Sequence, residues 1–283
     1  MEVKTYFDPN TATFTHLVWD GSSKQAAIID PVLDFNYCSG RTSTGSANSV
    51  IDDLKQHGLS LKYILETHAH ADHLSAAPHI KQQCGGQTGI GANVTAVQAV
   101  FKGVFNMADC ATDGSQFDLL LSEGDNLNLG ELTITVLETP GHTPACLSYQ
   151  IDDAIFIGDT FFAPHYGTAR ADFPGGDAST LYKSLERILS FPDETRLYLC
   201  HDYPAAGVAP QYLSTVADQR NNIHLQGSGA NDFIKLRKER DADLEMPVLI
   251  LPAIQVNICA GELPAPENNG VTYLKIPLNQ IGK

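Results

Sequence analysis

Residues 67–73 of this 283-residue chain, T-H-A-H-A-D-H, place four metal-capable side chains within six positions. In an extended segment, residues two apart point to the same side, so His68 and His70 can converge on one ion. If the chain then turns into a helix, Asp72 and His73 reach the far side of the same space. Imidazole nitrogens and a carboxylate suit transition metals such as zinc or iron. A polar turn with incidental histidines would need this spacing to arise by chance, so we predict a metal-binding turn.

Three further candidate ligands follow strand-like apolar runs. His142 lies in T-P-G-H-T shortly after the run 132–137, Asp159 lies in G-D-T after 154–157, and His201 follows 197–200. The first stretch likewise follows the apolar residues 63–65. Because residues just beyond several strand ends can gather at one rim of a sheet, we expect all of these side chains to meet there.

Composition limits the function classes. A hydrophobic content of 43% is ordinary for a globular enzyme, and the net charge of −15 argues against nucleic-acid partners. No apolar run is as long as a membrane span, and the amino-terminal residues lack secretory or transit character. We therefore expect a cytoplasmic protein with no membrane partner. The six cysteines show no C-x-x-C spacing, which favours reduced thiols over a disulfide framework.

The remaining elements predict an α/β protein. Two β-rich halves, each flanked by helices, fit a four-layer αββα sandwich forming one domain over residues 1–283. The proline-rich segment from about residue 246 is expected to wrap the core. The aromatic-containing loop 161–176 suits a substrate-facing position, whereas the basic run 235–240 is interpreted as a solvated helix face.

The motif order resembles the metallo-β-lactamase superfamily: H-x-H-x-D-H, then P-G-H-T-P, then G-D and a late histidine, spanning residues 68–201. Within it, the chain looks most like the persulfide dioxygenases of the ethylmalonic-encephalopathy protein type. Matches that carry this second resemblance lie at residues 66–73, 140–144, 158–159, 170–173, 181–182 and 201–203. The superfamily resemblance also implies that Asp30 supports the metal rim without binding the ion.

The resemblance implies a definite division of roles. One Fe(II) per chain would be held by His68, His142 and Asp159. The catalytic groups around that iron would be His70, Asp72, His73 and His201. In two-metal relatives those four positions bind metal, and the spacing does not decide between one ion and two.

The implied reaction is the oxidation of glutathione persulfide, or a related small persulfide, by O2 to sulfite and thiol. A homo-oligomer is expected. The alternative is a dinuclear thioester hydrolase of the glyoxalase II kind, which would use the same seven residues with Asp159 bridging two ions. A β-lactamase and a non-enzymatic metal sensor are less favoured alternatives.

Two departures from the family pattern concern the glutathione part of the substrate. His224 and Cys259 stand where relatives carry arginines that could pair with glutathione carboxylates. Neither replacement reproduces a bidentate guanidinium contact, so the sequence predicts weak dependence on those carboxylates. The predicted substrate contacts are Arg170, Tyr203, Arg220 and His224.

Overall fold

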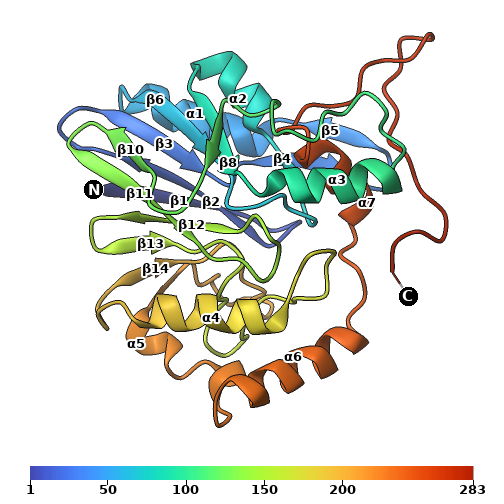
Figure 1. Cartoon of the computed structure of the whole chain (residues 1–283). Coiled ribbons are helices and arrows are strands. Elements are labelled where there is room, and N and C mark those ends of the chain that lie inside the picture. Colours follow the sequence, from blue (N-terminus) through green and yellow to red (C-terminus); the bar gives the residue numbers. More distant parts are fainter. Residues whose placement is uncertain (283) are drawn as a thin grey trace.

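Two six-stranded sheets lie face to face at the centre of the molecule, and helices cover both outer faces (Figure 1). The structure is a computed structural model and describes residues 1–282. The layers are those of an αββα sandwich, so the predicted fold class is confirmed. Apolar side chains from both sheets meet in one shared cluster, which includes Ile29, Leu65, Val136 and Phe156.

The first sheet has the strand order β1-β2-β3-β6-β8-β9. Its strands are β1 (Glu2–Asp8), β2 (Thr13–Trp19), β3 (Gln25–Ile29), β6 (Ser60–Leu65), β8 (Gln87–Gly91) and β9 (Leu119–Leu121). Successive side chains along each strand point to opposite faces of the sheet. Ile28 and Ile64 pack against helices α1 (Gly45–Gln56) and α2 (Ala77–Cys84), while their neighbours Ile29 and Leu65 face the second sheet. The near-continuous apolar runs of these strands follow from burial on both sides.

The second sheet has the strand order β10-β11-β12-β13-β14-β15. Its strands are β10 (Asn126–Leu129), β11 (Leu132–Glu138), β12 (Leu147–Ile151), β13 (Ala154–Phe156), β14 (Arg196–Tyr198) and β15 (Leu213–Thr215). Helix α4 (Ala178–Leu189) covers its outer face with Leu181, Leu185 and Ile188. The helix begins at Asp177, whose carboxylate accepts a hydrogen bond from Thr180 N at 2.7 Å, as expected of an N-cap. Helices α5 (Val216–Gln219) and α6 (Ala230–Asp243) follow, with a 3-10 turn at Ile223–Leu225.

The remaining elements lie at one end of the sandwich (Figure 1). A small sheet has the order β5-β4-β7, formed by β4 (Val32–Asn36), β5 (Arg41–Ser43) and β7 (Leu74–Ser75). Helices α3 (Val94–Val104) and α7 (Ile250–Asn257) share an apolar cluster that includes Phe101 and Ile254. The segment from about residue 246 thus contributes a helix that contacts β7. Within residues 1–282, no helix is long and apolar enough to cross a membrane.

Parallel strand pairing explains where side chains can gather. Strands β3, β6, β8 and β9 run parallel in the first sheet, and β13 pairs in parallel with β14 in the second. The carboxyl ends of parallel strands meet at one edge, where loops are free to carry polar residues. In this chain those loops contain the metal-binding motifs.

Candidate metal centre

Loops from both sheets bring the predicted ligands to one rim of the sandwich. His68 to His73 follow β6, His142 follows β11, Asp159 follows β13 and His201 follows β14. Two glycines make this approach possible. A Cβ on Gly141 would lie 2.3 Å from Leu181 atoms, and one on Gly158 would lie 2.7 Å from Thr67, and both glycines have positive φ. The P-G-H and G-D motifs therefore reflect close packing as well as ligand placement.

The pocket-side group, defined as His68, His142 and Asp159, forms the first of two clusters. Oδ2 of Asp159 lies 3.9 Å from Nε2 of His68 and 3.6 Å from Nε2 of His142. His142 donates from Nδ1 to the Arg170 carbonyl at 2.8 Å, so its Nε2 carries a lone pair directed at the cluster.

The orientation of His68 is fixed through a relay of hydrogen bonds. The Thr67 hydroxyl donates to Asp30 Oδ2 at 2.9 Å and is therefore left to accept from His68 Nδ1 at 3.0 Å. This leaves the lone pair on His68 Nε2. Burial, together with the nearby His70 and His142, holds the pKa of His68 well below its usual value. A neutral imidazole with a free Nε2 is the form that binds a metal ion.

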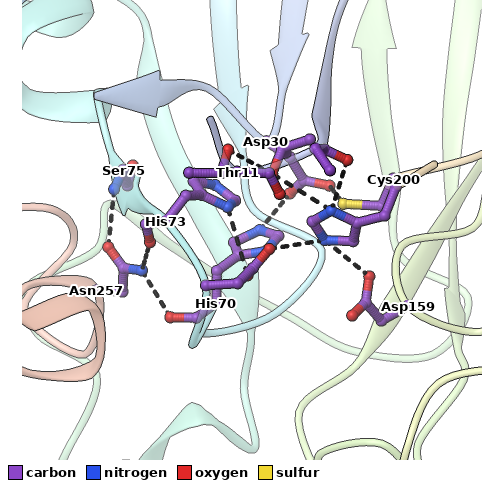
Figure 2. A network of polar contacts seen from close by, with 12 residues as sticks. Thr11, Asp30, His70, His73, Ser75, Asp159, Cys200 and Asn257 are labelled. Carbon is purple, nitrogen blue, oxygen red and sulfur yellow. Dashed lines mark hydrogen bonds and ion pairs between the residues drawn. The ribbon is translucent and has the colours of Figure 1, made fainter. Parts of the chain in front are cut away.

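The second cluster, called the buried group, is defined as His70, Asp72, His73 and His201, and its three imidazoles are buried. His70 Nε2 donates to Asp30 at 2.9 Å and lies 3.4 Å from Glu66. Burial would lower the pKa of His70, but these two carboxylates outweigh it and raise that pKa well above its usual value. A metal ion would have to displace the proton from Nδ1. His201 Nε2 lies 3.1 Å from Asp72 Oδ2 and 3.3 Å from Asp159 Oδ1. Figure 2 shows His70, His73 and Asp159 converging around this space.

Several ligand atoms of this centre are buried without a hydrogen-bond partner among the described residues. They are His70 Nδ1, both ring nitrogens of His73, Asp72 Oδ2, Asp159 Oδ1 and His201 Nε2. Buried polar atoms are normally paired, and atoms that face one another without hydrogen-bond geometry are those that a cation would bring together. Within residues 1–282, each group also offers three ligand atoms within 4.8 Å of one another. The residues present therefore fit a bound metal ion.

A cavity of about 520 Å3 opens onto the pocket-side group. His142 and Asp159 line it, as does Asp72 of the buried group. The imidazoles of His68, His70, His73 and His201 do not. Its aromatic walls come from Phe162, Tyr166, Phe173 and Tyr203. The predicted substrate-facing loop 161–176 therefore does line the cavity. Its size falls within the roughly 300–1,000 Å3 range of small-molecule sites.

Three of the four predicted substrate contacts border this cavity. They are Arg170, Tyr203 and His224. His224 accepts a hydrogen bond at Nδ1 from Thr168 N at 2.9 Å. Burial, with a contribution from Arg237 and Arg240, lowers the pKa of His224 to about 4, so the ring is neutral near pH 7.

Two sequence-based expectations about substrate recognition need correction. Arg220 does not line the cavity, because its guanidinium binds Asp193 at 2.8 Å and the Leu189 carbonyl at 3.0 Å, at the carboxyl end of α4. Cys259 is also absent from the cavity wall, and its sulfur lies 3.5 Å from that of Cys110 in the cluster between α3 and α7. The presence of Cys259 at this position therefore does not change the cavity wall directly.

Asn257 was not predicted to support the centre. Its amide nitrogen donates to the carbonyls of His70 and His73 at 2.8 and 2.7 Å, and its oxygen accepts from Ser75 N at 2.8 Å (Figure 2). A single asparagine far along the chain carries no local pattern that would reveal this role. Arg237 is buried and pairs with Asp241, so the prediction of a solvated helix face is wrong at this position.

Comparisons with known proteins agree with this geometry. Residues 9–201 match the family model described as the metallo-beta-lactamase superfamily. A probable metallo-hydrolase of Burkholderia pseudomallei is 53% identical, with 99% of this chain and 100% of that protein covered. Glyoxylase B2 of Dictyostelium discoideum is 45% identical, with 99% of this chain and 98% of that protein covered. The beta-lactamase hydrolase-like protein of Agrobacterium fabrum is 50% identical, and the chain spans 65% of its length.

More distant similarity connects the chain to persulfide dioxygenases. The mitochondrial persulfide dioxygenase ETHE1 of Mus musculus is 29% identical, with 92% of this chain and 88% of that protein covered. The crystal structure of ETHE1 from Myxococcus xanthus matches with a TM-score of 0.74 and 29% identity. That match covers 93% of this chain and 100% of the other.

Proposed function

The chain belongs to the metallo-beta-lactamase superfamily, and from this premise we propose that it is an iron-dependent persulfide dioxygenase. The substrate is glutathione persulfide or a related small persulfide. One persulfide, one O2 and one water give one thiol, one sulfite and two protons. The sulfane sulfur is oxidised, O2 is reduced, and the sulfur–sulfur bond breaks to release the thiol.

The observation that carries the proposal is the position of the cavity. His142 and Asp159 stand in its wall, and His68, which does not line the cavity itself, completes their cluster. The imidazoles of the buried group do not line the cavity. Two histidines and a carboxylate on one face are the ligand set of non-haem iron oxygenases. Fe(II) held by these residues would supply the redox chemistry that joins a persulfide sulfur to O2.

The chain's own residues prepare this site. Asp30 and the Arg170 carbonyl fix the tautomers of His68 and His142 through the hydrogen bonds described above. Phe162 and Phe173 are almost fully buried in the wall and reduce water access to the reacting atoms. Phe173 also packs edge-on against His142, with ring centroids 5.1 Å apart. The orientation of the ligands is thus set before a substrate arrives.

A second candidate is the dinuclear thioester hydrolase. It is favoured by the unpartnered ligand atoms of the buried group, which could hold a second ion beside Asp159. The 45% identity to glyoxylase B2 of D. discoideum supports the same alternative. The two candidates differ in metal content: about one iron per chain for the dioxygenase and about two ions for the hydrolase.

An oxygen electrode separates the two candidates. Fe(II)-loaded protein given fresh glutathione persulfide is expected to consume O2 and produce sulfite in equal amounts. The same preparation is expected to leave S-lactoylglutathione intact. A flat oxygen trace together with thioester hydrolysis and about two ions per chain would refute the dioxygenase and establish the hydrolase.

A further inference from the structure

The mouth of the cavity carries a cation that the metal centre does not use. We propose that Arg240 of helix α6 is a specificity-determining residue that binds a carboxylate in the thiol part of the substrate. This rests on the proposed function in one respect, namely that the molecule entering the cavity is a small persulfide. The sulfur would then lie at the metal end and the carboxylate at the mouth.

Three arginines border the cavity, and the charges of two are already matched. Arg170 forks onto Asp172 with contacts of 2.6 and 2.8 Å, and its third nitrogen donates to the Glu245 carbonyl at 2.6 Å. Arg237 binds Asp241 at 2.7 and 3.0 Å and donates to the Thr168 carbonyl at 3.0 Å. These two side chains hold the cavity wall together and have little capacity left for a ligand.

Arg240 differs from both. Within residues 1–282, none of the hydrogen bonds and ion pairs found in the structure involves its guanidinium, although the side chain borders the cavity. Other cations of the chain, such as Arg41, also lack an acidic partner among the described residues, but they do not line the cavity. Arg240 is thus the lining cation whose charge is left for a ligand. A guanidinium offers a planar fork of donors that matches a carboxylate.

The helix that carries Arg240 is held firmly against the cavity. Arg237 lies one turn earlier and is buried, and its partner Asp241 accepts a hydrogen bond from Ala171 N at 2.9 Å. Phe233 of the same helix is buried against α4. Because residues three apart lie on one face of a helix, these contacts fix the position of Arg240 at the mouth.

The charges along the cavity have opposite signs at its two ends. The carboxylates of Asp72 and Asp159 lie at the metal end, where a bound cation would offset them. Arg240 is exposed and lies near the neutral His224 and the exposed Tyr166, which stacks on Tyr203 with centroids 4.7 Å apart. A persulfide with a carboxylate on its thiol part fits this polarity in one orientation only.

The test uses binding, so that it does not depend on turnover. Isothermal titration of the anaerobic Fe(II)-loaded protein with glutathione is compared between the wild type, Arg240→Ala and Lys238→Ala. Lys238 is the matched control, because it is an exposed cation on the same helix that does not border the cavity. Each protein is also titrated with the diethyl ester of glutathione.

We expect Arg240→Ala to weaken glutathione binding about tenfold, between the values for exposed and desolvated ion pairs. The ester should bind the wild type and Arg240→Ala equally, and Lys238→Ala should stay within about twofold of the wild type. In turnover, the KM for glutathione persulfide should rise about tenfold with little change in kcat. Unchanged glutathione affinity in Arg240→Ala, an equal loss for the ester, or no glutathione binding by the wild type would overturn the proposal. A flat oxygen trace would count against the proposed function alone, since the binding comparison still decides the role of Arg240.

Discussion

The pocket-side group and the buried group of the metal centre use the same residue types in different surroundings. His142 and Asp159 of the first group line a cavity large enough for a substrate, whereas the second group reaches that cavity only through Asp72 and keeps its three imidazoles buried. Both groups combine imidazoles with carboxylates at ligand distance. The two groups therefore differ in their access to a molecule in the cavity. Residue identity alone does not determine that access.

Protonation separates the two groups further. Burial, with neighbouring imidazoles, keeps the pKa of His68 well below its usual value. Burial would also lower the pKa of His201, but the carboxylates of Asp72 and Asp159 outweigh it and raise that pKa. In the metal-free protein, one histidine is thus ready to bind an ion while the other is engaged in a charge pair.

The largest expected effect comes from removing a ligand of the pocket-side group. His142→Ala should lose most bound iron and lower kcat/KM by more than the roughly 10–100-fold typical of outer partners. The fold should persist, because the two sheets share an apolar core that is independent of the ion. Metal analysis and circular dichroism check both points, with His57→Ala as the control at an exposed histidine. Full iron occupancy in His142→Ala would show that the pocket-side group is not the iron site.

A smaller effect is expected from the buried group. Asp72→Asn should keep about one iron per chain and lower kcat/KM roughly 10–100-fold, since Asp72 would orient ligands without binding the ion. Metal analysis and oxygen uptake measure the two quantities, and Asp52→Asn on the exposed side of α1 is the control. If the wild type instead holds two ions and the variant holds one, the two groups are equivalent metal sites and the contrast between them fails.

Sequence patterns predict that the candidate ligands of both groups gather at one rim, because each lies shortly after an apolar strand, and the structure brings these side chains together. Such patterns could not locate contacts that depend on how helices pack. Arg220 was expected at the substrate, yet it binds Asp193 on the surface, and no local pattern indicates that pairing. Arg237 belongs to a charged run that resembles a solvated helix face, but Asp241 four residues later neutralises it inside the protein. Long-range partners of this kind are fixed by tertiary packing.

A third substitution tests the residue that supports the backbone of the metal loop, defined as residues 67–75, without changing any candidate ligand. Asn257→Ala should weaken iron binding about tenfold, because the backbone of residues 70–75 loses three hydrogen bonds. Gln255→Ala removes an amide from the same helix that bonds Leu251 and Lys275, and it should leave iron affinity unchanged. Competition with a chelator measures both affinities. Equal losses in the two variants would assign the effect to helix α7 as a whole.

The smallest expected effect is on folding stability and comes from His16, a buried histidine outside the metal centre. Burial lowers the pKa of His16 to about 4, partly offset by its contact with the Leu199 carbonyl. The unfolded chain takes up this proton near pH 6.5, so folding stability falls as the pH drops from 6.5 towards 4. Lowering the pH from 7.5 to 5 should therefore reduce the free energy of unfolding by about 2 kcal/mol through this group.

The variant for this test is His16→Gln, which keeps a donor for Leu199 and an acceptor for Thr5. Urea unfolding at the two pH values should show a smaller acid loss in His16→Gln than in the wild type. His57→Gln, at an exposed site, should behave like the wild type. An unchanged acid loss in His16→Gln would mean that other buried groups carry the acid sensitivity.

The three hydrogen bonds of Asn257 also bear on the order in which the molecule is assembled. They join the metal loop to a residue that is made 187 positions after His70. A chain leaving the ribosome can pair its strands and bury its apolar core long before that residue appears, because domains fold as their segments emerge. The loop reaches its final shape only when helix α7 docks. We therefore expect metal to enter late, as the closing event of maturation in the cell, and truncated or newly made chains to remain metal-poor.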